Sequence, residues 1–383
     1  MTFTESFLDG VGILKTTVPD AIMIAIAFLL MYLAIVKKYE SLLLLPLAFG
    51  MLVANIPITG LSAYDEGGLI FFLYQGIKLS VYPPLIFLCL GALTDFGPLI
   101  AQPRSAIIGI GGQFGIFTAL GIAVALGPIL SPIIPGFDGF TIQEAAVIGI
   151  IGSSDGPTTI YCATNLAPHI LPSVAIAAYS YMALVPIIQP PIMRLLTTEK
   201  ERVVVMPKQE AVTKRQKVLF PIIVTVVTLF LVPAAAALIS MMMLGNLIRE
   251  CGVADRYIDT LQTHLLNILT ILIGLCIGST ATGATFLTTQ TLLIVVLGLL
   301  AFCFGTVGGV LMAKILCFTT GGKINPLIGN SGVSAMPMAA RVSQKLGQEY
   351  NKKNHLIHHA MGPIVASTIG SAIVAGIFIS LFG

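Results

Sequence analysis

Three long stretches of this chain contain no charged residue: Ser105–Phe137, Val218–Leu244 and Leu265–Ala313. A helix that crosses a bilayer needs about 20 apolar residues, so each stretch can cross at least once and the last can cross twice. Of the 383 residues, 56% are hydrophobic and 10% are charged, whereas soluble domains carry about 25% charged residues. These features predict an all-α polytopic membrane protein with about 9–11 membrane helices.

The positive charges gather in one loop, Arg194–Lys217, where lysines and arginines outnumber the acidic residues. Loops of this kind stay on the cytoplasmic side, so we expect a multi-pass protein of the cytoplasmic (inner) membrane. The loop, residues 194–217, separates N-terminal membrane helices (1–82) and a first repeat (83–193) from a second repeat (218–383). The net charge of +3 is small, and basic residues do not alternate with aromatic ones, so we expect no nucleic-acid partner.

A polar, glycine-rich motif, Gly152–Thr159, interrupts the apolar residues of the first repeat. Asp155 in this motif is the only carboxylate between Glu144 and Glu199. An ionisable residue at membrane depth costs roughly 2.5–3.5 kcal/mol, so it is retained where it pairs, binds an ion or moves a proton. The glycines and Pro157 break a helix, and a broken helix at membrane depth lines a cavity. The alternative interpretation is an ordinary turn, which the same residue types also form.

A second motif of the same character, Gly321–Ser334, lies in the second repeat. Each motif follows glycine-rich apolar spans and precedes a helix. This arrangement predicts two inverted repeats whose discontinuous or re-entrant helices meet near the midplane. No acid occurs between Asp259 and Glu349, so the second repeat offers Asp155 only neutral oxygens, which suits a monovalent cation. The candidate cation ligands are Asp155, Ser153, Ser154, Asn325, Asn330, Ser331 and Ser334.

Two charged residues outside these motifs have two interpretations each. Arg341 either extends to the lipid headgroups or holds a substrate that bears a carboxylate. Asp95 is either a cap or an interfacial anchor next to a turn, or it belongs to the ion path. The segment Gly245–His264 mixes apolar and charged residues at helical spacing, which predicts a helix on the membrane surface.

The two motifs, with the second continued through Arg341, resemble the β subunit of the biotin-dependent, sodium-translocating decarboxylases. That family includes the membrane subunits of oxaloacetate, methylmalonyl-CoA and glutaconyl-CoA decarboxylases. The resemblance extends from about Gly91 to the C-terminus. It implies that the chain decarboxylates carboxybiotin on a partner carrier, consumes a proton taken from outside, and exports Na⁺.

The resemblance also implies roles for individual residues. Asp155 would bind Na⁺ and exchange it for a proton, while Asn325 and Ser334 would line the ion path. Arg341 would meet carboxybiotin, and Tyr181 would take part in proton or ion passage. The implied partners are a biotin carrier, a carboxyltransferase, a small membrane γ subunit and membrane lipid, with room for a homo-oligomer. The carboxyltransferase, outside this chain, would choose the acyl substrate.

Without the resemblance, the buried acid and the broken helices favour another function, a stand-alone Na⁺/H⁺ or Na⁺/carboxylate secondary transporter. A structural scaffold would leave Asp155 without a purpose. Decarboxylation of carboxybiotin requires a proton at the ureido nitrogen and a site poor in water. Asp155 can supply this proton only if burial favours its protonated form.

Overall fold

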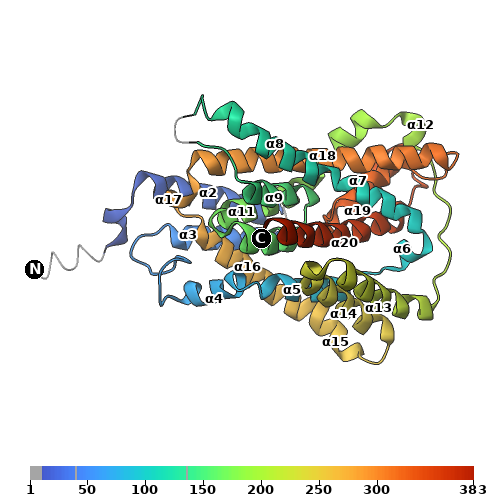
Figure 1. Cartoon of the computed structure of the whole chain (residues 1–383), viewed down its shortest axis with the longest axis horizontal. Coiled ribbons are helices and arrows are strands. Elements are labelled where there is room, and N and C mark those ends of the chain that lie inside the picture. The colour runs from blue at the N-terminus through green and yellow to red at the C-terminus, as the bar shows by residue number, and fades with distance from the viewer. Residues whose placement is uncertain (1–10, 39–40, 135–136) are drawn as a thin grey trace, which may run out of the picture.

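The computed structural model describes residues 11–38, 41–134 and 137–383, and within these ranges the chain forms helices and no strands. The first ten residues of the predicted N-terminal region therefore lie outside the described part. Figure 1 shows the helices packed into one elongated bundle. The α-helices are α2 (Val18–Ile35), α3 (Ser41–Ala54), α4 (Leu69–Lys78), α5 (Tyr82–Leu93), α6 (Gly97–Ala101), α7 (Ala106–Gly112), α8 (Phe114–Leu130), α9 (Ile142–Ile150), α10 (Gly156–Leu166), α11 (Leu171–Leu196), α12 (Glu199–Arg202), α13 (Lys214–Leu231), α14 (Ala236–Cys251), α15 (Asp255–Asp259), α16 (Leu266–Thr280), α17 (Gly283–Phe286), α18 (Thr289–Thr319), α19 (Met338–Tyr350) and α20 (Ile357–Phe382). The 3₁₀ segments used below are η3 (Ile151–Ser153), η4 (Pro168–Ile170), η5 (Pro233–Ala235) and η7 (Pro326–Gly332), and η6 (Thr260–Leu265) is a π-helix.

The lengths of the helices agree with a membrane protein. In the described residues, six helices are long and apolar enough to cross a membrane, and the number rises to eight if each of two bent pairs is one span. Two shorter apolar helices, Ser41–Ala54 and Ile142–Ser153, accompany them. The predicted all-α, multi-pass membrane architecture is confirmed. The expected count of about 9–11 helices is reached only when the short elements are included.

The uncharged stretch Val218–Leu244 does not form one helix. α13 ends at Leu231, Pro233 begins η5, and α14 starts at Ala236. Proline has no backbone N–H and its ring clashes with the preceding turn, so the helix cannot continue through it. The stretch therefore contributes to two helices that pack against each other.

The prediction of one surface helix over Gly245–His264 is wrong. Gly245 to Cys251 form the last turns of α14, and both Gly245 and Asn246 are buried there. Gly252, at φ = 70°, ends α14 in the left-handed conformation that glycine adopts readily. A separate helix, α15, begins at Asp255. The mixture of apolar and charged residues therefore marks the partly buried end of α14 and the start of α15, in which no residue is buried.

Two pairs of helices pack through glycines in the same way. α3 packs against α16, and α14 packs against α5. A Cβ atom on Gly278 of α16 would lie 1.9 Å from the carbonyl oxygen of Leu47. A Cβ atom on Gly91 of α5 would likewise lie 1.9 Å from the carbonyl oxygen of Met242. Small residues thus let both pairs of backbones approach closely, as is common between membrane helices.

The long helix α18 runs antiparallel to α7 and α8. Gly111 of α7 lies against Gly308 and Met312, whereas Gly115, farther along the chain, lies against Ala301 and Gly305. α18 also packs against α11, against η3 and against η7. It therefore contacts both of the short segments that precede the breaks in the two polar motifs.

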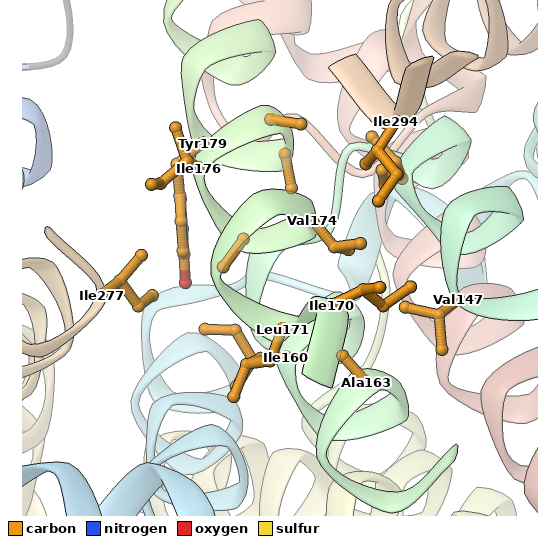
Figure 2. Close-up of a cluster of buried hydrophobic side chains, with 14 of the residues drawn as sticks. Val147, Ile160, Ala163, Ile170, Leu171, Val174, Ile176, Tyr179, Ile277 and Ile294 are labelled. Atoms are coloured by element: carbon orange, nitrogen blue, oxygen red, sulfur yellow. The ribbon is translucent and has the colours of Figure 1, made fainter. Parts of the chain in front are cut away.

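A layer of buried apolar side chains surrounds α11. Figure 2 shows Val147 of α9, Val174 of α11 and Ile294 of α18 gathered with Ile170. All four have exposed fractions of 3% or less. On α9 this layer lies between Glu144 and the Asp155 motif, and on α11 it lies before Tyr179. The interior between Glu144 and the Asp155 motif is therefore packed with hydrocarbon side chains.

Candidate functional site

The first polar motif forms a break between two helices. α9 continues into η3, and Ser154 then adopts the left-handed conformation at φ = 54°. Such a φ is uncommon for a residue other than glycine. Asp155 follows as the N-cap of α10, with Pro157 in the first turn, where its missing N–H costs nothing. The break places the Asp155 side chain over the N-terminus of α10, and only 4% of this residue is exposed.

Both carboxylate oxygens of Asp155 accept hydrogen bonds. The backbone N–H of Thr158 donates to Oδ1 over 3.2 Å, and the Ser371 hydroxyl of α20 donates to Oδ2 over 2.7 Å. Among the described residues, no lysine, arginine or histidine forms an ion pair with Asp155. The carboxylate is thus buried among neutral donors, which leaves its negative charge available to a cation.

Asp155 lines a cavity of about 260 Å³. The cavity also contains the neutral oxygens of Ser154, Ser334, Thr368, Asn267 and Thr270. The Ser154 hydroxyl is buried and has no hydrogen-bond partner among the residues that the structure describes, and the same is true of the Thr158 hydroxyl. A buried, unpartnered hydroxyl beside a carboxylate fits the ligand set of a hard monovalent cation.

The two polar motifs meet at this cavity. The backbone N–H of Ser334 donates a hydrogen bond of 2.7 Å to the carbonyl oxygen of Ser153. The second motif thus supplies η7, an extended Val333–Ser334 stretch, and then α19. Ser153 contributes its backbone here, because its own hydroxyl bonds to the Ile150 carbonyl. Of the predicted cation ligands, Asp155, Ser154 and Ser334 line the cavity.

The remaining predicted ligands have other partners. Asn330 donates to the side chain of Gln189 over 2.8 Å and accepts from Ser343, in a fully buried network that also includes Ser331. Asn325 donates to the carbonyl oxygens of residues 202 and 204 and accepts from the Leu327 amide. None of these three predicted ligands lines the Asp155 cavity. Their side chains fix η7 to its neighbours.

Two tyrosines of α11 point in different directions. Tyr181 donates a hydrogen bond to the carbonyl oxygen of Val295 on α18 and does not line the cavity. Tyr179 does line it, and its ring lies so close to Gly156 that a Cβ atom there would be 2.3 Å away. Figure 2 shows Tyr179 extending from α11 toward α16, the helix of Ile277. Tyr179, rather than Tyr181, is therefore the tyrosine beside Asp155.

Arg341 lies on α19, outside the Asp155 cavity. It lines a second, larger cavity of about 770 Å³ together with Arg194, Lys345 and Glu349. Both cavities are lined by Leu42 and Pro337, so they adjoin. Since Arg194 ends α11 next to the basic loop, this larger cavity lies at the end of the molecule that the loop marks. Arg341 thus lies in the cavity that adjoins the Asp155 cavity, and not at the carboxylate itself.

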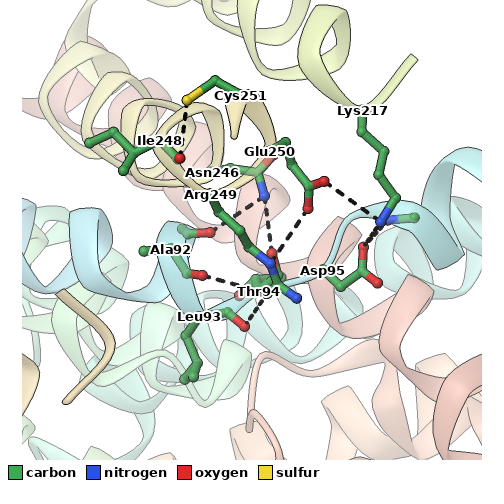
Figure 3. Close-up of polar contacts among 12 residues, drawn as sticks. Ala92, Leu93, Thr94, Asp95, Lys217, Asn246, Ile248, Arg249, Glu250 and Cys251 are labelled. Carbon is green, nitrogen blue, oxygen red and sulfur yellow. Dashed lines mark hydrogen bonds and ion pairs between the residues drawn. The ribbon is translucent and has the colours of Figure 1, made fainter. Parts of the chain in front are cut away.

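Asp95 does not line the cavity and belongs to a separate polar network (Figure 3). Lys217 of α13 donates to the Asp95 carboxylate over 2.9 Å, and the Gly97 amide donates over 2.8 Å. Burial by itself raises the pKa of the Asp95 carboxyl. The two hydrogen bonds together lower this pKa by more than burial raises it, so the pKa lies below its ordinary value. Lys217 also lies 3.7 Å from Glu250 of α14. Of the two interpretations of Asp95, the structure favours the anchor.

Four residues of the site escaped the sequence analysis: Ser371 and Thr368 of α20, and Asn267 and Thr270 of α16. They are uncharged polar residues within apolar helices. In such a helix a serine or threonine commonly bonds to the carbonyl one turn earlier, as Thr270 and Thr368 also do here. No signal in the sequence separates the residues that face the cavity from those that face lipid.

The family model for the Na⁺-transporting oxaloacetate decarboxylase beta subunit matches residues 19–382. The chain is 50% identical to methylmalonyl-CoA decarboxylase subunit beta of Veillonella parvula, over 98% of this chain and 97% of that one. It is 48% identical to glutaconyl-CoA decarboxylase subunit beta of Acidaminococcus fermentans, over 99% and 97%. It is 44% identical to oxaloacetate decarboxylase beta chain 2 of Salmonella typhi, over 99% of both. A match over nearly the whole chain means that this protein belongs to the family of sodium-transporting decarboxylase beta subunits.

Proposed function

We propose that this chain, as the membrane subunit of a sodium-pumping decarboxylase, couples the decarboxylation of carboxybiotin to the export of Na⁺ through Asp155. In this reaction the bond between the ureido nitrogen and the carboxylate carbon breaks and CO₂ leaves. The electron pair of the broken bond stays on the nitrogen. One proton is then added at that nitrogen. The observation that supports the proposal most directly is a buried carboxylate without a cationic partner, placed where the two broken motifs meet.

Na⁺ is the transported substrate in this scheme, and it would bind in the Asp155 cavity. The carboxylate supplies one negative charge, while Ser154, Ser334 and Thr368 supply neutral oxygens. A divalent ion would require more negative charge than one carboxylate. Because Na⁺ and a proton would occupy the same carboxylate, release of the cation is linked to protonation of Asp155.

Carboxybiotin would enter through the larger cavity, where Arg341 lies. The guanidinium group is permanently charged and can hold a carboxylate with two parallel hydrogen bonds. The names of the relatives describe β subunits of decarboxylases, and we therefore propose a multi-subunit complex. Its other members would be a biotin carrier, a carboxyltransferase and a small membrane γ subunit.

Transport also requires that the ion site open to the two sides in turn, and the helix pairs suggest how. We propose that the chain consists of two inverted repeats, one from α2 to α11 and the other from α13 to α20. The support is that α3 with α16 and α14 with α5 both pack through a glycine whose Cβ atom would lie 1.9 Å from a carbonyl oxygen, and that α7–α8 and α18 run antiparallel. The first repeat then includes the helices of residues 1–82, which the sequence analysis had set apart. Rocking of such repeats against each other would alternate access to Asp155.

The substitution Asp155→Asn tests the proposal. It removes the charge that binds Na⁺ and the group that carries the proton. We expect both Na⁺-dependent decarboxylation by the complex and Na⁺ uptake into vesicles to be abolished. Asp95→Asn is the matched control, since Asp95 lies in the anchor network, and it should retain both activities. Coupled transport that survives Asp155→Asn would refute the assignment.

The rival function, a stand-alone Na⁺ carrier, uses the same cavity but needs no biotin. Avidin added to vesicles that contain the complex distinguishes the two. If a biotinyl partner drives transport, avidin stops Na⁺ uptake. If the chain acts as a stand-alone carrier, uptake continues unchanged, and the proposed coupling is wrong.

A further inference from the structure

In the cavity that Arg341 lines, some charged side chains form ion pairs and others do not. Arg194 donates to Glu349 over 2.7 Å, so each of these side chains neutralises the other. Arg341 and Lys345 line the same cavity and are exposed. Neither forms an ion pair or a side-chain hydrogen bond with any residue that the structure describes. Lys38, which precedes α3, lines the same cavity and is also exposed. On α19, the wall of the cavity therefore carries two positive charges without acidic partners among the described residues.

The two positive charges lie on one face of α19. Residues four apart on a helix are neighbours on its surface, so Arg341 and Lys345 project in the same direction. Both residues line the larger cavity, and both also line a shallower pocket that continues from it along α19. A cavity of about 770 Å³ lies within the range of about 300–1,000 Å³ that small-molecule sites occupy. The face can thus hold an anionic small molecule between the two side chains.

We infer that Lys345 binds the carboxylate of carboxybiotin together with Arg341. We also infer that Glu349, by pairing with Arg194, limits the net positive charge of this site. This inference rests on the proposed function. It also has a consequence for turnover. Decarboxylation converts the bound carboxylate into neutral CO₂, so the product biotin no longer carries the charge that Lys345 holds. The site therefore favours the carboxylated form over the product.

The first test replaces the lysine. In the purified complex supplied with free carboxybiotin, Lys345→Gln should raise KM for carboxybiotin about five- to tenfold, the effect of losing one charge-assisted contact. The kcat and the Na⁺ concentration for half-maximal activity should not change. Lys345→Arg keeps the charge and should restore most of the affinity. Lys353→Gln is the control, because Lys353 is exposed and does not line the cavity.

The second test changes the opposite charge. Glu349→Gln removes the partner of Arg194 and adds one net positive charge to the same cavity. If charge determines binding, this variant should lower KM for carboxybiotin, opposite in sign to Lys345→Gln. If the two residues only maintain the structure of α19, both substitutions should raise KM. The sign of the Glu349→Gln effect therefore separates a binding role from a structural role.

The outcomes keep this inference distinct from the proposed function. An unsubstituted complex that fails to decarboxylate free carboxybiotin overturns the proposed function and the inference with it. An active complex in which Lys345→Gln behaves like Lys353→Gln overturns the inference alone. So does a Glu349→Gln variant whose KM rises together with that of Lys345→Gln.

Discussion

A carboxylate that is closed off from water needs partners for both of its oxygens, and here a backbone amide and a single hydroxyl provide them. Ser371 donates to Asp155 over 2.7 Å, and its oxygen also lies 3.0 Å from the carbonyl oxygen of Thr368. A hydroxyl has one hydrogen, so it can serve only one of these acceptors at a time. The ionised carboxylate is the stronger acceptor. Ser371 therefore stabilises the form of Asp155 that binds a cation.

Ser371→Ala should consequently weaken Na⁺ binding. A hydrogen bond to a charged group contributes about 1.5–3 kcal/mol, which corresponds to at least a tenfold change in affinity. We expect the Na⁺ concentration for half-maximal decarboxylation to rise about tenfold while the complex still assembles. Ser173→Ala is the matched control, since it removes a buried hydroxyl bond of the same 2.7 Å length to Thr291 on α18. Equal shifts in the two variants would contradict a specific role for Ser371.

The sequence predicted the residues of the site in proportion to how strongly they depart from an apolar helix. Asp155 was identifiable because a lone acid among glycines and a proline has few structural explanations. Ser334 was identifiable from its motif. Asn330 looked equally suitable, yet the tertiary structure pairs it with Gln189, which is distant in sequence. Ser371 was missed because an uncharged serine in a membrane helix commonly bonds to the backbone of its own helix, and nothing local marks it as a site residue.

At the scale of the elements, one buried glutamate joins three of them. Glu144, at the start of α9, accepts from the Thr141 amide in a capping box and from Gln290 of α18 over 2.7 Å. His169 of η4 also lies 2.7 Å from its carboxylate. α9, η4 and α18 thus meet at the end of the molecule opposite to Arg341. Along α9, Val147 of the apolar layer lies between Glu144 and the Asp155 motif.

Replacing this glutamate should loosen that end of the molecule. Glu144→Gln replaces one of the two acceptor oxygens by an NH₂ group. The side chain can then accept either from Gln290 and His169, which share Oε1, or from Thr141, which bonds to Oε2, but not from both, at a cost of about 1–2 kcal/mol. We expect a lower midpoint of thermal unfolding for the purified chain in detergent. Glu66→Gln is the control, because Glu66 is exposed and should leave the midpoint unchanged. A Glu144→Gln variant with the midpoint of the control would show that the three elements are held by apolar packing alone.

The boundaries of the elements followed from the sequence where proline or glycine determines the backbone locally. The break at Asp155 was predicted from such residues, and the structure has it. The interruption at Pro233 was overlooked, because hydropathy alone does not distinguish one long span from two packed helices. The end of α14 at Gly252 was overlooked for a related reason. Its charged residues were assigned to a membrane surface, whereas Arg249 donates to the Leu93 carbonyl at the end of α5.

At the scale of the whole molecule, the arrangement depends on helix backbones that touch at glycines, one on α5 and one on α16. The two helix pairs α3–α16 and α5–α14 are far apart in sequence, and no periodicity in either helix specifies its partner. What the sequence did show is an excess of glycine in apolar spans, which permits close contact without choosing it. The structure chooses the partners through the fit of Gly278 against Leu47 and of Gly91 against Met242.

Gly91→Ala and Gly278→Ala should therefore have equal effects, one in each half. Each added Cβ atom would lie 1.9 Å from a carbonyl oxygen, so the paired helices must separate. Overpacking of this kind costs about 1–3 kcal/mol, and we expect both variants to unfold at lower temperature than the parent chain. Gly121→Ala is the control, because its Cβ atom would meet nothing within 4 Å. If one of the two variants is as stable as the control while the other is not, the two helix pairs are not equivalent, and the division of the chain into inverted repeats is wrong.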